Sequence, residues 1–243
     1  MALLLMLTFS FNAGVNALPP PQHAQGQKQA LILSSMNQTV PMGHYAQNLM
    51  YYLNKVGYTV TYLTDSMVTV DFLLNNMNQY SIVIWRTNTF NWIHTTFWYV
   101  GEKINSNTEQ KYASDFAAGT LNDKTGIFGV SLDFINEHFG PGTLSGVKLL
   151  IFMASMGSGA APIFINAGVS SVIFCNGVIS LQFGLLDTLT VQMVAYLSMG
   201  QDVNSAVYET ISPYDQYQTP EDELDTTYAP PFWFAGNSTL TIV

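Results

Sequence analysis

The 243-residue chain is long enough for one α/β domain with a substantial core. Apolar residues make up 48% of the chain and charged residues only 9%, and the net charge is −9 because 16 acidic residues outnumber 7 basic ones. A surface of this sign repels phosphate groups, so nucleic acids are excluded as partners.

The first 17 residues form a short apolar run that ends in small residues, Val15-Asn16-Ala17. This pattern predicts a signal peptide and a secreted protein, although the usual basic start is missing. We expect membrane contact only if the segment is retained as an N-terminal anchor. Residues 18–27, with three consecutive prolines, are expected to form an extended linker, and residues 28–243 a single domain.

The first third of this domain alternates between strand and helix patterns. Residues 28–36 and 80–90 contain compact apolar runs typical of buried strands, and residues 58–65 alternate like a strand. Between them, residues 42–57 have helical apolar spacing and end in a glycine, and residues 67–79 suit a short helix. This order predicts a parallel sheet with right-handed crossovers.

The pattern is less regular in residues 91–124, which we expect to form a small hairpin insertion, with 95–103 and 111–121 as its main segments. Alternation then resumes with a strand over 147–153 and a helix over 185–200. The predicted fold class is therefore a three-layer α/β sandwich, in which helices flank a mainly parallel sheet. Residues 230–243 are expected to add an edge strand or hairpin.

Polar clusters follow three of the predicted strands. Ser34-Ser35 follows the first strand, Arg86-Thr87-Asn88-Thr89 follows the third, and Ser155-Met156-Gly157-Ser158 follows the strand over 147–153. In open α/β sheets, ligands bind beyond the carboxyl ends of the strands. A site is therefore expected at this edge.

Common hydrolase and metal motifs do not fit Ser155. An α/β-hydrolase needs a glycine where Met153 stands and a histidine after the serine, whereas the last histidine is His138. The Ser155-Met156 pair with Pro162 downstream suits a subtilisin-like enzyme, but the partner motifs are missing. The four histidines are scattered and none is paired at helical spacing, so no metal site and no cofactor are expected.

Several stretches together resemble the caspase-like cysteine peptidases, the group that includes gingipains, clostripain and legumains. "YSIVIWRTNTF" resembles the strand that carries the catalytic histidine, and "GVKLLIFMASMGSG" the strand that carries the catalytic cysteine. Two further stretches of this chain resemble the part of the family that follows these strands. They are "FINAGVSSVIFCNGVISLQFGLLDTLT" and "LSMGQDVNSAVYETI". The resemblance extends in order and spacing over roughly residues 28–211, and it implies a caspase-like sheet in which the two catalytic strands are neighbours.

The resemblance also implies that the catalytic histidine belongs at Asn88 and the cysteine at Ser155, so both catalytic groups are replaced. A serine hydroxyl is a poor nucleophile without an adjacent base, and an asparagine amide does not accept a proton near neutral pH. We therefore expect a secreted pseudopeptidase that binds a peptide or protein ligand in the strand-end cleft.

Two alternatives stay open. Ser155 could act in an active peptidase if His94, six residues after Asn88, folded back over the strand ends. Alternatively, the chain could be an unrelated secreted α/β protein with a glycan-binding or cell-surface role, which its Asn, Thr and Tyr content suggests. Its four tryptophans, three of them within residues 85–98, keep carbohydrate or peptide binding open. Cys175 follows an apolar run and is expected to be a buried small residue rather than a relocated nucleophile.

Arg86, Ser35 and Asp187 are the candidate ligand-binding residues at the same edge. Arg86 is the only arginine, and its planar guanidinium suits a ligand carboxylate, although a structural salt bridge to Glu102 or Asp187 is an alternative. Asp187 matches a position of the resembled family at the start of a helix, where capping alone would explain a carboxylate.

Overall fold

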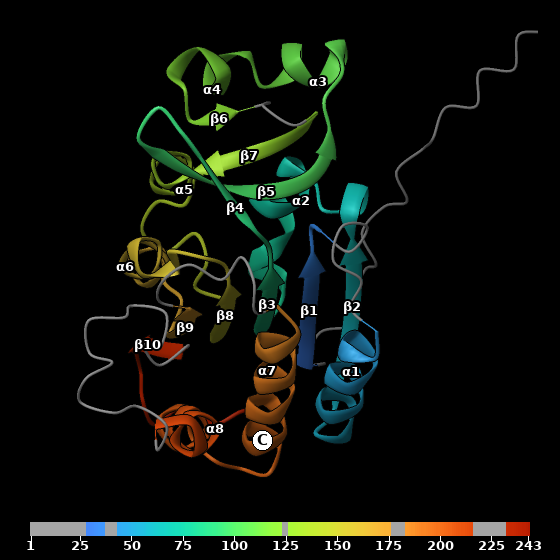
Figure 1. Ribbon diagram of the computed structural model, residues 1–243, viewed down its shortest axis with the longest axis vertical. Coiled ribbons are helices and arrows are strands. Elements are labelled where there is room, and N and C mark those ends of the chain that lie inside the picture. Colours follow the sequence, from blue (N-terminus) through green and yellow to red (C-terminus); the bar gives the residue numbers. More distant parts are fainter. Residues whose placement is uncertain (1–27, 37–42, 123–125, 176–182, 216–231) are drawn as a thin grey trace, which may run out of the picture.

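A computed structural model of the chain describes residues 28–36, 43–122, 126–175, 183–215 and 232–243 (Figure 1). The predicted signal peptide and linker lie outside the described residues. Within the described ranges, none of the helices has the length and apolar character that a membrane crossing requires.

The main sheet has six strands in the order β10-β9-β8-β3-β1-β2. The first five strands along the chain run parallel, and the last one pairs antiparallel with its neighbour and closes one edge. The central strands of this sheet, which begin at Lys28, Ile82 and Leu149, are almost entirely buried and mostly apolar, as expected for a sheet that is covered on both faces. The strands are β1 (Lys28–Ser34), β2 (Tyr58–Thr64), β3 (Ile82–Arg86), β8 (Leu149–Met153), β9 (Ser171–Cys175) and β10 (Phe232–Gly236).

Alternate residues of these strands point to opposite faces, and each face packs against its own layer of helices. Ile84 and Ile151 belong to the core beneath α1 (Tyr45–Lys55), α7 (Phe183–Ser198) and α8 (Val203–Asp215). Trp85 and Phe152, one position further along, belong to the opposite core. That core is covered by α2 (Val70–Asn76), α5 (Leu132–His138) and α6 (Ala161–Asn166). The predicted three-layer α/β sandwich is confirmed.

A second, antiparallel sheet with the order β4-β5-β7-β6 lies beyond the carboxyl ends of the parallel strands, in the upper part of Figure 1. Its members are β4 (Thr89–Trp92), β5 (Thr95–Lys103), β6 (Leu121–Asn122) and β7 (Ile127–Ser131), with α3 (Ser106–Lys111) and α4 (Ala113–Ala118) between β5 and β6. Short 3-10 helices occur at η1 (Asp65–Met67), η2 (Met77–Gln79) and η3 (Gly157–Gly159).

The insertion is thus present, but its second half is not the predicted hairpin arm. Residues 111–121 are mostly helical, because an Asn105–Thr108 capping box starts α3 and Gly119 ends α4 in a left-handed conformation. The β hairpin is formed instead by β4 and β5, and it leaves directly from the end of β3.

The C-terminal tail ties distant parts of the main domain together. Backbone carbonyls of Ser238 and Leu240 accept hydrogen bonds, each 3.0 Å long, from the first two N–H groups of α8. The Ile242 carbonyl then accepts a 3.2 Å hydrogen bond from the hydroxyl of Tyr58, the first residue of β2. The tail therefore connects the β10 edge of the sheet with the β2 edge.

Candidate functional site

The strand ends that carry Asn88 and Ser155 lie next to each other. β3 and β8 are paired parallel strands in which Arg86 is opposite Met153, so the residues that follow both strands leave the sheet at the same edge. A 3.0 Å hydrogen bond from the Thr87 amide to the Met153 carbonyl continues this pairing past the end of β3. The neighbouring position expected for these two strand ends is observed.

Ser155 is held in a covered position. The chain turns sharply after β8 because Met156 has a positive φ of 57°, and η3 begins directly afterwards. Only 2% of Ser155 is exposed, and its carbonyl accepts a 3.0 Å hydrogen bond from the indole N–H of Trp98 in β5. The small sheet therefore packs over this strand end, and the serine is not presented to solvent as an accessible nucleophile.

Asn88 starts the β4–β5 hairpin. Its side-chain oxygen accepts a 2.8 Å hydrogen bond from the Thr89 amide, and its carbonyl accepts one of 3.0 Å from the Tyr99 amide. These bonds fix the first turn of the hairpin. Asn88 therefore has a local structural role at the position where the resemblance calls for a catalytic base.

His94 lies at the exposed tip of this hairpin. Ile93 and His94 form the two-residue turn, with positive φ angles of 45° and 67°. Trp98, which contacts Ser155, lies four residues further into the hairpin, about 13 Å along an extended strand. Thr96, two residues after His94, lies with its hydroxyl 3.7 Å from the Met156 sulfur, so this part of the hairpin faces the turn that follows Ser155.

Arg86 forms the structural salt bridge that was the alternative to ligand binding. Its Nε and one terminal N–H group donate to the two Asp187 carboxylate oxygens at 2.8 and 3.0 Å, and its other terminal nitrogen lies 3.4 Å from the Ser34 hydroxyl. The Arg86 side chain is 0% exposed, and its guanidinium carbon lies 5.8 Å from the centre of the Tyr45 ring. Burial raises the pKa of Asp187, and the pairing with Arg86 opposes that effect.

Asp187 is not a helix cap. It is the fifth residue of α7, which begins at Phe183, so its carboxylate turns inward to Arg86 rather than back to the first helical amides. The other suggested partner, Glu102, accepts a 2.9 Å hydrogen bond from the Val70 amide and thereby supports the start of α2. Of the two suggested partners of Arg86, Asp187 therefore forms the salt bridge and Glu102 supports the start of α2.

A pocket of about 410 Å³ lies above this salt bridge, between the first turns of α1 and α7. Its volume is in the range of small-molecule and peptide side-chain pockets. Part of its floor is fixed, since the Tyr45 hydroxyl contacts the Met153 sulfur at 2.7 Å and Asp187 is paired with Arg86. Its lining residues include Gly43, His44, Tyr45, Asn48, Asp187 and Thr188.

Sequence reasoning missed the α1 side of this pocket. The signal that could have found it is the Gly43-His44-Tyr45 turn, which follows the first strand and begins a helix at the same sheet edge.

Comparisons with known proteins add no family. No family model matches the sequence, and no curated protein matches it. Among solved structures, protein GSU0716 from Geobacter sulfurreducens is similar at a TM-score of 0.43 with 11% sequence identity, over 86% of this chain and 94% of that chain. A likeness this distant bears on neither activity nor ligand.

The remaining predicted site residues belong to the interior. Ser35 is 3% exposed, and its hydroxyl is 3.4 Å from the indole nitrogen of Trp85. Cys175 is buried, and this burial raises the pKa of its thiol, which disfavours the reactive thiolate. Trp85 and Trp98 are buried as well, whereas Trp92 and Trp233 are 42% and 49% exposed.

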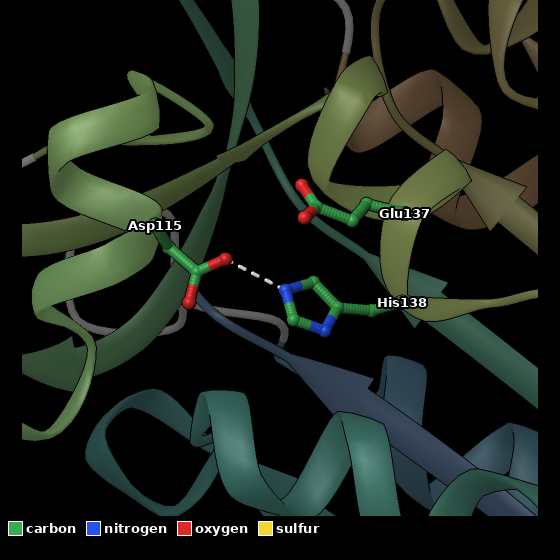
Figure 2. A group of neighbouring side chains, drawn as sticks. All are labelled: Asp115, Glu137 and His138. Atoms are coloured by element: carbon green, nitrogen blue, oxygen red, sulfur yellow. Dashed lines mark hydrogen bonds and ion pairs between the residues drawn. The ribbon is translucent and has the colours of Figure 1, made fainter.

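One group of metal-ligating side chains was not expected from the sequence. Asp115 of α4 and Glu137 and His138 of α5 lie together, with their ligand atoms within 4.8 Å of one another (Figure 2). The expectation of no metal site rested on the absence of paired histidines along the chain. Here the tertiary fold, and not a local motif, brings the donor atoms together.

Proposed function

We propose that the protein is a catalytically inactive relative of the caspase-like peptidases that binds a peptide or a protein segment in the pocket between α1 and α7. The observation that carries this proposal is the pair of neighbouring strand ends at which Asn88 and Ser155 stand in place of a base and a thiol. The adjacency of β3 and β8 is the sheet order that the resemblance requires.

The chemistry of this pair supports a loss of catalysis. Acyl transfer by serine needs a general base within hydrogen-bonding distance of the hydroxyl. Asn88 cannot supply one, and His94 lies in the exposed turn at the tip of the β4–β5 hairpin. Ser155 is also almost completely covered, so a substrate carbonyl has no approach to its hydroxyl without displacement of the β4–β5 hairpin.

The pocket supports the retention of binding. It lies at the carboxyl ends of β1 and β3, where α/β sheets hold their ligands, and it has both polar and apolar walls. The buried Arg86–Asp187 pair holds α7 against the sheet, so this side of the pocket is preformed. A preformed pocket loses little conformational entropy on binding, which favours recognition of a short segment.

The binding part is tested with a random peptide library displayed on phage and selected against the purified protein. We expect enriched peptides that lose affinity for the Thr188→Trp variant, because Thr188 is an exposed pocket residue whose replacement by tryptophan fills the space. Met199→Trp is the matched control, since Met199 is 65% exposed just past the other end of the same helix. Equal binding to both variants would refute the assignment of the pocket.

The catalytic part is tested separately with a fluorophosphonate probe. We expect no covalent label on the native chain, whereas a label mapped to Ser155 by mass spectrometry would show an active serine hydrolase. The two experiments are independent. Labelling of Ser155 would refute the loss of catalysis, whereas equal peptide binding to the two variants would refute the pocket.

A further inference from the structure

The cluster of Asp115, Glu137 and His138 lies in the insertion half of the molecule and has no part in the proposed peptide pocket. Asp115 comes from α4, and Glu137 and His138 are the last two residues of α5 (Figure 2). One Asp115 carboxylate oxygen is 2.6 Å from His138 Nε2, and a Glu137 oxygen lies within 4.8 Å of both atoms.

Surrounding contacts hold two of these three side chains in place. The Thr120 hydroxyl is 3.4 Å from the bonded Asp115 oxygen, and the Thr120 amide donates a 3.0 Å hydrogen bond to the Asp115 carbonyl. The His138 ring packs against Phe134, with ring centres 4.3 Å apart. Such supporting contacts orient the ligands of protein metal sites.

The three side chains of the cluster differ in exposure, and the side of Glu137 is open to solvent. The Asp115 side chain is 11% exposed and that of His138 is 30% exposed, while Glu137 is exposed. The anchored pair therefore lies beside an exposed carboxylate, at a position that solvent can reach. A cation can enter from this side and retain water as a further ligand.

The donor set selects the type of cation. An imidazole nitrogen with two carboxylate oxygens suits zinc and similar transition metals, whereas calcium and magnesium take oxygen ligands. Two carboxylates also balance the charge of one divalent ion when the imidazole is neutral. Around zinc, ligand atoms at about 2.1 Å from the metal lie about 3.4 Å apart, so Asp115 and His138 need to separate by less than 1 Å while Glu137 moves inward.

We propose that Asp115, Glu137 and His138 form a binding site for a divalent transition metal of the zinc type. On binding, the cation takes the position between Asp115 and His138 Nε2, and the neutral imidazole carries its proton on Nδ1. His138 then binds through Nε2, Asp115 and Glu137 each bind through one oxygen, and water completes the coordination. The site joins α4 of the insertion to the end of α5.

The test is metal titration of the full chain after treatment with a chelator. Isothermal titration with zinc is expected to give one equivalent per chain, and cobalt is expected to give visible absorption bands that zinc then removes. His138→Gln and Glu137→Gln are each expected to weaken zinc binding by about tenfold or more. Asp133→Asn is the matched control, because Asp133 is an exposed carboxylate on the same helix but outside the cluster.

Two results would overturn the proposal. One is the absence of stoichiometric zinc binding by the native chain at micromolar concentrations. The other is equal affinity in the native chain and in Glu137→Gln, a variant that loses only an exposed carboxylate and so should keep its fold. Neither result bears on the peptide pocket.

Discussion

Replacement of Asp187 by alanine tests the central salt bridge. The substitution removes both carboxylate oxygens that accept hydrogen bonds from Arg86, at 2.8 and 3.0 Å, and leaves a guanidinium that is 0% exposed. Removal of one partner from a buried ion pair costs about 3–5 kcal/mol, because the remaining charge stays desolvated. The Asp187 side chain is itself 13% exposed, so water can enter on that side, and we expect a loss near the lower limit, about 3 kcal/mol.

Urea denaturation followed by circular dichroism measures this loss as a lower midpoint. The double variant Arg86→Met with Asp187→Leu removes both charges and fills the space with apolar atoms. It should recover most of the lost stability, because buried ion pairs are often replaceable by apolar groups of similar volume. A loss below about 1 kcal/mol for Asp187→Ala, or a double variant no more stable than the single one, would refute the reasoning.

Three further predictions concern other buried polar groups. Burial raises the pKa of Glu102 above its ordinary value of 4.5. The folded state therefore binds this proton more tightly than the unfolded state, and native stability falls as the pH rises from 4.5 through the pKa of the folded state. The stability of Glu102→Gln relative to the native chain should therefore increase between pH 4 and pH 7 in urea denaturation, and a pH-independent difference would contradict this. Gln29→Met should raise the free energy of unfolding by about 1–2 kcal/mol, because neither amide atom of this buried side chain has a hydrogen-bond partner. A lower midpoint in thermal denaturation would count against it. Trp98→Phe should cost about 1–3 kcal/mol by leaving the buried Ser155 carbonyl without its indole donor, and an unchanged urea midpoint would show that this bond is dispensable.

The layers of the fold were predictable because they depend on local patterns. Apolar runs such as residues 28–36 and 147–153 can be buried only in a sheet covered on both faces, and the helical spacing between them supplies the covering layers. A parallel order then follows because a helix between two strands returns the chain to the same end of the sheet. The same local patterns predict that Asn88 and Ser155 lie at one edge of the sheet.

The features that the sequence does not predict are of two kinds. Some depend on contacts between residues that are distant in the sequence, and others on helix boundaries that the apolar pattern does not mark. Asp115 and His138 are 23 positions apart, so no motif in the sequence marks their contact. The helices over residues 111–121 were mistaken for a hairpin arm because they are short and carry little apolar periodicity. Asp187 was expected to cap α7 because the periodic pattern starts at residue 185, whereas the helix begins two residues earlier, at Phe183.

Residues 232–243 have a consequence for how the main sheet folds. Their carbonyls accept hydrogen bonds from the first amides of α8 and from the Tyr58 hydroxyl at the far side of the sheet, and β10 forms one edge strand. The contact with Tyr58 joins residues that are 184 positions apart in the sequence. The link between the two sheet edges therefore closes a long loop, and its chain-entropy cost is met only once the strands between them are in place.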